Sequence, residues 1–235
     1  MKAIITGGSS GLGYEIARQL RYKNYDVILI GTNRKKLEKA QAQLGAIVSD
    51  ATIEGFAFDI SDEDNVIGFF NLLNDRHEVI DYLFNVAGKG YFGIIEEINN
   101  NSIMDTLKPN MIGLMLMTAH GVRFFKAFPA SKKRIVSVLS TAALKGKKHE
   151  AIYNASKWGA RGFLESVREE VSSTNIDIIN IYPGGMLTPF WDNSISGYAV
   201  GTFMKPEDVA KQIVTISTDH NTWISDVTIN RPRQV

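Results

Sequence analysis

Cysteine is absent from the 235 residues of this chain. Its absence excludes disulfides, thiolate metal sites, iron–sulfur clusters and cysteine nucleophiles. The four histidines show no common metal-ligand spacing, and we expect no metal ion in the functional site. A chain without cysteine fits a reducing compartment, so we expect a cytoplasmic protein.

An excess of one charge and a long hydrophobic run are also missing. Lys and Arg total 26, Asp and Glu total 25, and the net charge is +1. This balance provides no electrostatic footprint for nucleic acid or for an anionic membrane. No window reaches the ~18 apolar residues of a membrane span. The apolar run at residues 3–6 is too short for a signal peptide. We expect no nucleic-acid partner, no membrane partner and no targeting segment.

The composition is that of a globular domain, with 44% hydrophobic and 22% charged residues. Short β-branched runs alternate with segments of helical period. Several runs, such as residues 27–30, are almost continuously apolar, which is typical of parallel strands covered on both faces. The pattern predicts a single domain over residues 1–235. Its class is α/β, a doubly wound Rossmann-like fold with a seven-stranded, mainly parallel sheet and helices on both faces. The expected strands are residues 2–6, 26–31, 54–58, 79–85, 134–140, 176–182 and 223–229.

Local signals place several helix ends. Asn24 follows the first helix and tolerates the left-handed conformation of a helix end. Asn33 is expected to cap a helix that runs through Leu44. Ser61, with an acid three residues later, resembles a capping box. The basic residues 132–134 precede a strand and are interpreted as a solvated loop.

A glycine-rich segment, TGGSSGLG at residues 6–13, connects the first strand to the first helix. Glycines allow a sharp turn and a close approach of backbone to a pyrophosphate, and a helix N-terminus attracts that anion. The spacing G-x-x-x-G-x-G differs from the usual G-x-G-x-x-G, and a plain βα turn is the alternative. Its position in the first βα connection favours a nucleotide site.

The end of the second strand bears on the choice of cofactor. Thr32, Asn33 and Arg34 are followed by two lysines, and no acid is present. An acid there would bind the ribose of NAD, whereas a basic residue accommodates the 2′-phosphate of NADP. NADP(H) is therefore favoured over NAD(H). The alternative is that these basic residues are a solvated first helical turn, although they oppose the helix dipole there.

Three residues carry candidate chemistry. Tyr153 and Lys157 are four residues apart and share one helix face, and Ser140 ends the fifth strand. Reduction of a carbonyl by hydride transfer needs an acid for the forming alkoxide. A nearby ammonium and an oxidised nicotinamide would lower the pKa of the Tyr153 phenol, and Ser140 would donate to the substrate oxygen.

These elements occur in one order that spans essentially the whole chain, which resembles a single-domain short-chain dehydrogenase/reductase. The matching elements are Thr6-Gly7-x-x-x-Gly11-x-Gly13, Asp59, Asn85-Val86-Ala87-Gly88, Asn110, Ser140, Tyr153-x-x-x-Lys157 and Pro183-Gly184-Gly185-Met186-Leu187-Thr188.

The resemblance implies a role for each matching residue. Tyr153 would be the acid/base, Lys157 would hold the nicotinamide ribose, and Asn110 would hold a water that links Lys157 to solvent. The implied catalytic residues are Asn110, Ser140, Tyr153 and Lys157. With the end of the second strand included, the expected cofactor-binding residues are Gly7, Ser9, Ser10, Gly11, Leu12, Gly13, Thr32, Asn33, Arg34, Asp59, Ile60, Asn85, Ala87, Gly88, Tyr153, Lys157, Pro183, Gly184, Met186 and Thr188.

Two loops bear on the substrate. Residues 189–204 are rich in aromatic residues and contain two candidate hinge glycines, so they are expected to form a substrate lid. The basic residues 145–149 lie between Ser140 and Tyr153. A solvated loop is the favoured interpretation of this segment. The competing hypothesis is that Lys147 and Lys148 bind an anionic group.

The first functional hypothesis is an NADPH-favouring oxidoreductase that reduces a small ketone or aldehyde, or oxidises the matching alcohol. The alternative is an NADP-binding sensor or scaffold with vestigial chemistry, although the complete set of four catalytic residues speaks against it. A nucleotide-sugar epimerase is disfavoured by the glycine spacing. The expected partner is a small carbonyl or alcohol substrate, and the resemblance implies a homodimer or homotetramer.

Overall fold

A parallel sheet lies at the centre of the computed structural model, which describes residues 1–129, 131–191 and 198–232. Its seven strands follow the order β3-β2-β1-β4-β5-β6-β7, and each neighbouring pair is parallel. The doubly wound α/β fold predicted from the sequence is confirmed. The strands are β1 (Lys2–Thr6), β2 (Asp26–Gly31), β3 (Ile53–Ala57), β4 (Tyr82–Asn85), β5 (Lys133–Val138), β6 (Ile176–Pro183) and β7 (Asp226–Ile229).

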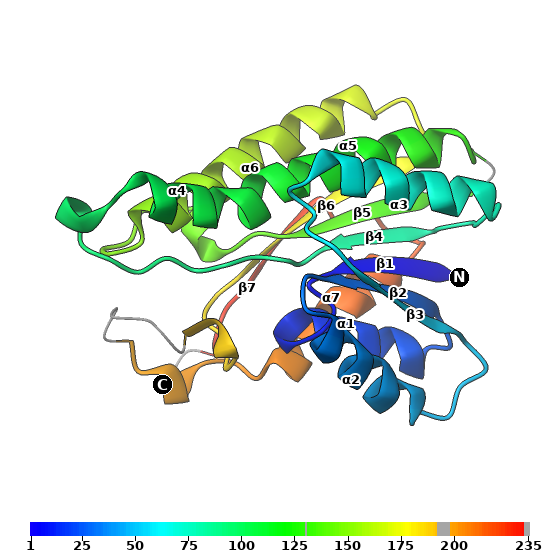
Figure 1. Cartoon of the computed structure of the whole chain (residues 1–235), viewed down its shortest axis with the longest axis horizontal. Helices are drawn as coiled ribbons and strands as arrows, with labels where there is room; N and C mark the ends of the chain where they lie inside the picture. The colour runs from blue at the N-terminus through cyan, green and yellow to red at the C-terminus, as the bar shows by residue number, and fades with distance from the viewer. Residues whose placement is uncertain (130, 192–197, 233–235) are drawn as a thin grey trace.

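Helices cover both faces of this sheet (Figure 1). One apolar core packs against α1, α2 and α7, and the other packs against α3, α5 and α6. The strands that separate the cores bury both of their faces, which explains their almost continuous apolar sequences. The helices are α1 (Gly11–Tyr22), α2 (Arg34–Gly45), α3 (Glu63–Asp75), α4 (Asn100–Leu107), α5 (Gly113–Lys126), α6 (Ala151–Glu170) and α7 (Pro206–Thr218). Among the residues described, none of these helices is both long and apolar enough to cross a bilayer.

The helix ends agree with the local signals at two of three places. Asn24 has a φ of 60°, and the Asn33 side chain accepts a hydrogen bond from the Lys36 N–H at 3.0 Å. The prediction at Ser61 is wrong, because α3 begins one residue later. Asp62 caps that helix by accepting from two backbone N–H groups, while the Ser61 hydroxyl donates to Asp59 at 2.8 Å.

The expectation of a solvated loop at residues 132–134 holds for the exposed Lys132 and is wrong for Lys133 and Arg134. Strand β5 begins at Lys133, and the side chains of Lys133 and Arg134 are each 1% exposed. Both cations can be buried because each pairs with a carboxylate in the folded chain. Lys133 Nζ lies 3.2 Å from Asp81 Oδ1, and Arg134 Nε lies 3.3 Å from Asp177 Oδ2.

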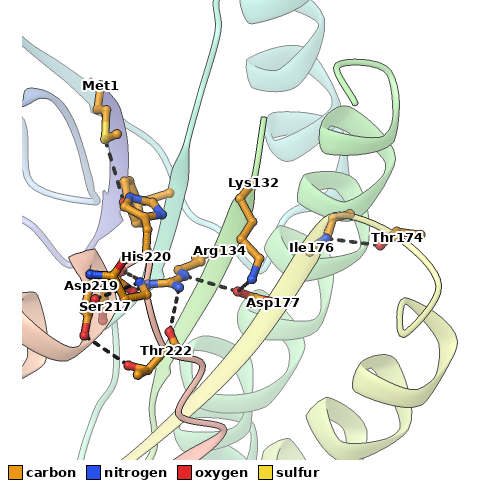
Figure 2. Close-up of polar contacts among 12 residues, drawn as sticks. Met1, Lys132, Arg134, Thr174, Ile176, Asp177, Ser217, Asp219, His220 and Thr222 are labelled. Atoms are coloured by element: carbon orange, nitrogen blue, oxygen red, sulfur yellow. Dashed lines mark hydrogen bonds and ion pairs between the residues drawn. The ribbon is translucent and has the colours of Figure 1, made fainter. Parts of the chain in front are cut away.

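Arg134 also holds the end of α7, as Figure 2 shows. Its guanidinium donates to the carbonyl oxygens of Ser217 at 2.8 Å, of Asp219, and of Thr222 at 3.1 Å. The last carbonyls of a helix have no partner within the helix. Arg134 supplies those partners and thereby fastens α7 to the amino end of β5.

Candidate active site

The carboxyl ends of four strands surround one cavity of about 250 Å³. Segments that follow β1, β4, β5 and β6 line it, together with α6. Strand β1 pairs with both β2 and β4, so the strand order reverses at this point. Doubly wound sheets bind their ligands at such a reversal, beyond the carboxyl ends of the strands.

The turn after β1 forms the cavity floor from glycine backbone. Gly7 has a φ of +68°, and a Cβ on it would lie 2.9 Å from the Cα of Ala87. A Cβ on Gly13 would lie 2.3 Å from the carbonyl oxygen of Gly7. A side chain at either position would separate the turn from the β4 loop or from the start of α1.

Thr6 joins the same two turns by hydrogen bonds. Its hydroxyl oxygen accepts from the N–H of Val86 at 2.9 Å and from the N–H of Ala87 at 3.1 Å. The glycine motif includes Thr6, but the sequence alone did not predict this role for it. Its place directly before the first motif glycine was the available signal.

Tyr153 lies in the first turn of α6 and is 7% exposed. Burial raises its pKa above the ordinary value, a hydrogen bond with Ser140 lowers it, and the charge of Glu150 raises it. The protein groups together therefore hold Tyr153 in its protonated form. The expectation that the lysine ammonium lowers this pKa is not met by the protein groups alone. Lys157 Nζ lies 5.8 Å from the centre of the Tyr153 ring and donates elsewhere.

Lys157 lies one turn further along α6 and is 4% exposed. Its ammonium donates to the carbonyl oxygen of Val138, the last residue of β5, at 3.1 Å. Burial lowers the pKa of Lys157 to about 8. Gly88 leaves space beside it, because a Cβ on Gly88 would lie 3.6 Å from Lys157 Nζ and 3.1 Å from Asn110 Oδ1.

Asn110 is fully buried in a π-helical turn, Lys108–Ile112, between α4 and α5. Its Oδ1 accepts from the Lys89 N–H at 2.7 Å, and its Nδ2 donates to the Lys89 carbonyl at 2.9 Å. The same amide donates to Ser156 Oγ at 3.0 Å. Asn110 thus ties the loop after β4 to the helix that carries Tyr153. It does not line the cavity itself.

The predicted site residues fall into two groups. The cavity is lined by Gly7, Ser10, Gly11, Leu12, Gly13, Ala87, Gly88, Ser140, Tyr153, Lys157, Pro183, Gly184, Met186 and Thr188. Outside this lining lie Ser9, Thr32, Asn33, Arg34, Asp59, Ile60, Asn85 and Asn110. Several of these residues lie at or after the carboxyl ends of strands, along the same edge of the sheet as the cavity.

Asn85 is the clearest difference from the expectation of a cofactor contact. Its side chain turns into the core, where Nδ2 donates to Thr118 Oγ1 at 3.0 Å and to Ser137 Oγ at 3.3 Å. Arg34, at the start of α2, is exposed, as expected for a residue that meets a ligand at the rim.

Aromatic side chains close one side of the cavity. The rings of Phe190 and Trp191 line it, and the Phe190 ring packs against Tyr153 with centroids 5.5 Å apart. Phe92 packs on Trp191 at 4.9 Å. Within the expected lid, residues 192–197 lie outside the described residues. The described part, from residue 198 to 204, packs Tyr198 and Phe203 against Trp191.

Two charged residues line the cavity beside these rings. Lys147, from the basic loop, does so, whereas its neighbour Lys148 is exposed. Glu150 is 1% exposed and accepts a hydrogen bond from the Tyr198 hydroxyl at 2.7 Å. Sequence reasoning missed Glu150, and its position three residues before Tyr153 was the only signal for it.

A doubly wound parallel sheet with a glycine turn after β1 and a cavity at the strand reversal defines a nucleotide-binding α/β protein. The model of the short chain dehydrogenase family matches residues 1–199. The chain therefore belongs to the short-chain dehydrogenase/reductase family, as the motifs had predicted.

Three relatives extend this match over the whole chain. The sepiapterin reductase of Chlorobaculum tepidum is 27% identical over 234 residues, which cover 97% of this chain and 95% of that protein. A short-chain dehydrogenase/reductase of Vibrio parahaemolyticus is 30% identical, with a TM-score of 0.83 and 98% and 100% coverage. An alcohol dehydrogenase of Thermococcus sibiricus complexed with 5-hydroxy-NADP shares the fold, with a TM-score of 0.87 at 20% identity and 100% and 97% coverage. The chain is an oxidoreductase that acts on CH–OH or carbonyl groups.

Proposed function

We propose that this enzyme uses NADPH to reduce a small ketone or aldehyde, or oxidises the matching alcohol with NADP⁺. The observation that carries the proposal is the Tyr153 phenol. Burial keeps it protonated, and it lines the cavity at the strand reversal together with Ser140 and Lys157. We place the whole reaction in a single domain, residues 1–235, with residues 189–204 as its lid.

The residues at the cavity floor fit a dinucleotide. Gly7, Gly11 and Gly13 leave their backbone uncovered at the start of α1, where N–H groups and the helix dipole favour a pyrophosphate. A Cβ on Gly11 would lie 3.6 Å from Thr188 and would fill the space between α1 and the segment after β6. When bound, the nicotinamide supplies the hydride that reduces the carbonyl carbon.

The remaining cofactor contacts extend from this floor along the strand ends. Asp59 and Ile60 would lie beside the adenine, and Ala87 and Gly88 beside the ribose and nicotinamide. Met186 and Thr188, after β6, would hold the carboxamide. Ser9 supports the adenosine end, because its hydroxyl lies 3.3 Å from a Cβ built on Gly31 at the end of β2.

Each side chain around the substrate oxygen has its own role in the reaction. Ser140 donates a hydrogen bond as negative charge develops on that oxygen. Tyr153 gives its proton to the oxygen in reduction and takes it back in oxidation. Lys157 holds the nicotinamide ribose, and its ammonium stabilises the tyrosinate that forms. Asn110 holds the water through which Lys157 exchanges protons with solvent, and its amide fixes α6 against the β4 loop.

A basic residue at the end of β2 supports the preference for NADPH. Arg34 is exposed at the first turn of α2, beside Thr32 and Asn33, and no acid lies between Gly31 and Leu37. The guanidinium is suited to the 2′-phosphate that distinguishes NADP. The fold relative from Thermococcus sibiricus was solved with an NADP derivative.

Cellular context is proposed from the family resemblance and the composition. We propose a cytoplasmic enzyme that assembles as a homodimer or homotetramer. Size-exclusion chromatography with light scattering tests the assembly, and a monomer at working concentrations contradicts it.

The test of the function is consumption of NADPH against a panel of aldehydes, diketones and quinones. Tyr153→Phe removes the proton donor, so kcat should fall by about 10²–10⁴-fold. The binding of NADPH, measured by fluorescence titration, should change little. Tyr22→Phe, on the exposed outer side of α1, is the matched control and should retain full turnover. A Tyr153→Phe enzyme with wild-type kcat would falsify the assignment of the proton donor.

A further inference from the structure

Glu150 is a buried acid whose side chain does not cap its own helix. It stands at the N-cap position of α6, yet its side chain accepts no hydrogen bond from the first backbone N–H groups of that helix. The side chain instead accepts from the Tyr198 hydroxyl at 2.7 Å. The residue is 1% exposed and lines the cavity that contains Tyr153 and Ser140.

The described residues provide Glu150 with no cation. The ion pairs formed within residues 1–129, 131–191 and 198–232 do not include it. A carboxylate removed from water is unfavourable unless a cation or several donors face it. One neutral hydroxyl offsets only part of the free-energy cost of removing the carboxylate from water. A positive group that enters the cavity would offset the rest.

Lys147 does not fill this role, although it lines the same cavity. Its ammonium donates to Thr141 Oγ1 at 3.1 Å and lies beyond ion-pair distance of Glu150. Lys147 is also less deeply buried than Glu150. Within residues 1–129, 131–191 and 198–232, the carboxylate of Glu150 therefore lines the cavity without an ion-pair partner.

Aromatic rings line the same cavity as Glu150. Trp191 stands perpendicular to Tyr198 with centroids 5.5 Å apart, and Phe190 stands beside Tyr153. Phe190 and Trp191 both line the cavity. The face of an aromatic ring carries negative charge density and attracts a cation, most strongly for Trp. A carboxylate beside such rings favours an ammonium group and disfavours a second carboxylate.

We propose that Glu150 is a specificity-determining residue and that the natural substrate is a carbonyl compound that carries a cationic amine. The amine binds Glu150 between the rings of Trp191 and Phe190, while the carbonyl oxygen meets Tyr153 and Ser140. This inference rests on the proposed carbonyl reduction. It contradicts the alternative in which Lys147 recruits an anionic substrate, because an anion in this cavity would also face Glu150.

The test uses three ketones with one skeleton and different charges. They are 4-(aminomethyl)acetophenone, which is cationic at pH 7, the neutral 4-ethylacetophenone, and the anionic 4-acetylbenzoic acid. We expect kcat/KM with NADPH to be higher for the amine than for the neutral ketone by about tenfold or more, and lowest for the acid. Equal values, or a preference for the acid, overturn the proposal.

Two variants assign the effect to Glu150. Glu150→Gln keeps the shape and the acceptor for Tyr198 but removes the charge, so the amine-to-neutral ratio should fall to about one. Glu170→Gln, at the far exposed end of the same helix, is the matched control and should keep the wild-type ratio. A ratio that survives Glu150→Gln contradicts the proposal.

Calorimetry separates this inference from the proposed function. The amine and the neutral ketone are titrated into the NADP⁺-loaded wild-type and Glu150→Gln proteins. If no ketone is turned over but the amine binds about tenfold more tightly and loses this advantage in Glu150→Gln, carbonyl reduction fails and the Glu150 site stands. Equal binding of both ketones to wild-type protein refutes the Glu150 site whatever the turnover.

Discussion

A buried cation lies at each end of strand β5. Arg134 lies where the strand begins, and the ammonium of Lys157 lies beside its last residue, Val138. Both are almost fully buried, at 1% and 4% exposure. Their surroundings differ in the number of acceptors that each meets.

The protein supplies Arg134 with four acceptors for its five N–H donors. Its guanidinium reaches one carboxylate, of Asp177, and three carbonyl oxygens at the end of α7 (Figure 2). Lys157 has three N–H donors, and in the described chain the hydrogen bond to the carbonyl of Val138 is its polar contact. Burial accordingly lowers the pKa of Lys157 to about 8.

The difference separates a structural cation from a functional one. A buried charge whose donors mostly find acceptors within the fold stabilises a contact between elements, here β5 with α7. A buried charge with donors to spare is disfavoured in the folded chain alone and is stabilised by what binds there. Two cations of similar burial, one on β5 and one on α6 beside the end of β5, thus have opposite expected effects on stability and on activity.

Arg134→Met is expected to have the larger effect on stability. The substitution removes the buried partner of Asp177, which keeps only its ion pair with Lys132. It also leaves the carbonyls at the end of α7 without their donor, so the free energy of unfolding should fall by about 3–5 kcal/mol. Urea titration at fixed protein concentration measures this change. Arg76→Met is the matched control, since its ion pair with Glu54 is exposed and should contribute less than about 1 kcal/mol. A wild-type midpoint for Arg134→Met would show that the network does not stabilise the fold.

Lys157→Met is expected to have the opposite effects, a large loss of activity without a loss of stability. Loss of the ammonium should lower kcat/KM by about 10²–10³-fold, because the charge that supports Tyr153 and the ribose is removed. The free energy of unfolding at pH 7 should stay unchanged or rise, because a desolvated charge is removed from the core. Parallel NADPH assays and urea titrations measure both quantities, with Lys211→Met on the exposed side of α7 as control. A strong loss of stability in Lys157→Met would place Lys157 in the same class as Arg134.

The sequence predicted the parts of the fold that depend on local patterns. The apolar run at residues 27–30 is a strand buried on both faces because its alternate side chains face two different cores. The glycine turn could be recognised because Gly7 and Gly13 stand where a Cβ would collide with backbone. The Asn33 cap was predictable because its partner lies three residues away.

Apart from the cap at Ser61, the errors and omissions depend on contacts between distant residues. The charges at Lys133 and Arg134 resemble a solvated loop in the sequence. In the fold, Asp81 pairs with Lys133, and the end of α7 with the residues after it, more than 80 residues later, brings three carbonyls to Arg134. Glu150 resembles an ordinary exposed acid until Tyr198 donates to it across the cavity. Asn85 was expected to line the cofactor site, and its side chain bonds Thr118 and Ser137 in the core. In each case the partner is far away in the chain and leaves no local signal.

The pH dependence of stability provides the finest test of the two cations. The pKa of Lys157 is about 8 in the folded chain and 10.5 in the ordinary state. Below pH 8 both states carry the proton, and the full cost of the buried charge is present. As pH rises from 8 toward 10.5, the unfolded state binds more protons than the folded state, so stability rises, by up to about 1 kcal/mol per pH unit.

Urea titrations between pH 7.5 and 9.5 measure that slope, in a range below the ionisation of the tyrosines whose pKa burial raises. Wild type and Lys211→Met should become more stable across this range relative to Lys157→Met, which lacks the titrating group. The difference between the curves isolates Lys157, because all other titrating groups are shared. Parallel curves for wild type and Lys157→Met would mean that the ammonium is already satisfied within the fold, and the distinction between the two ends of β5 would disappear.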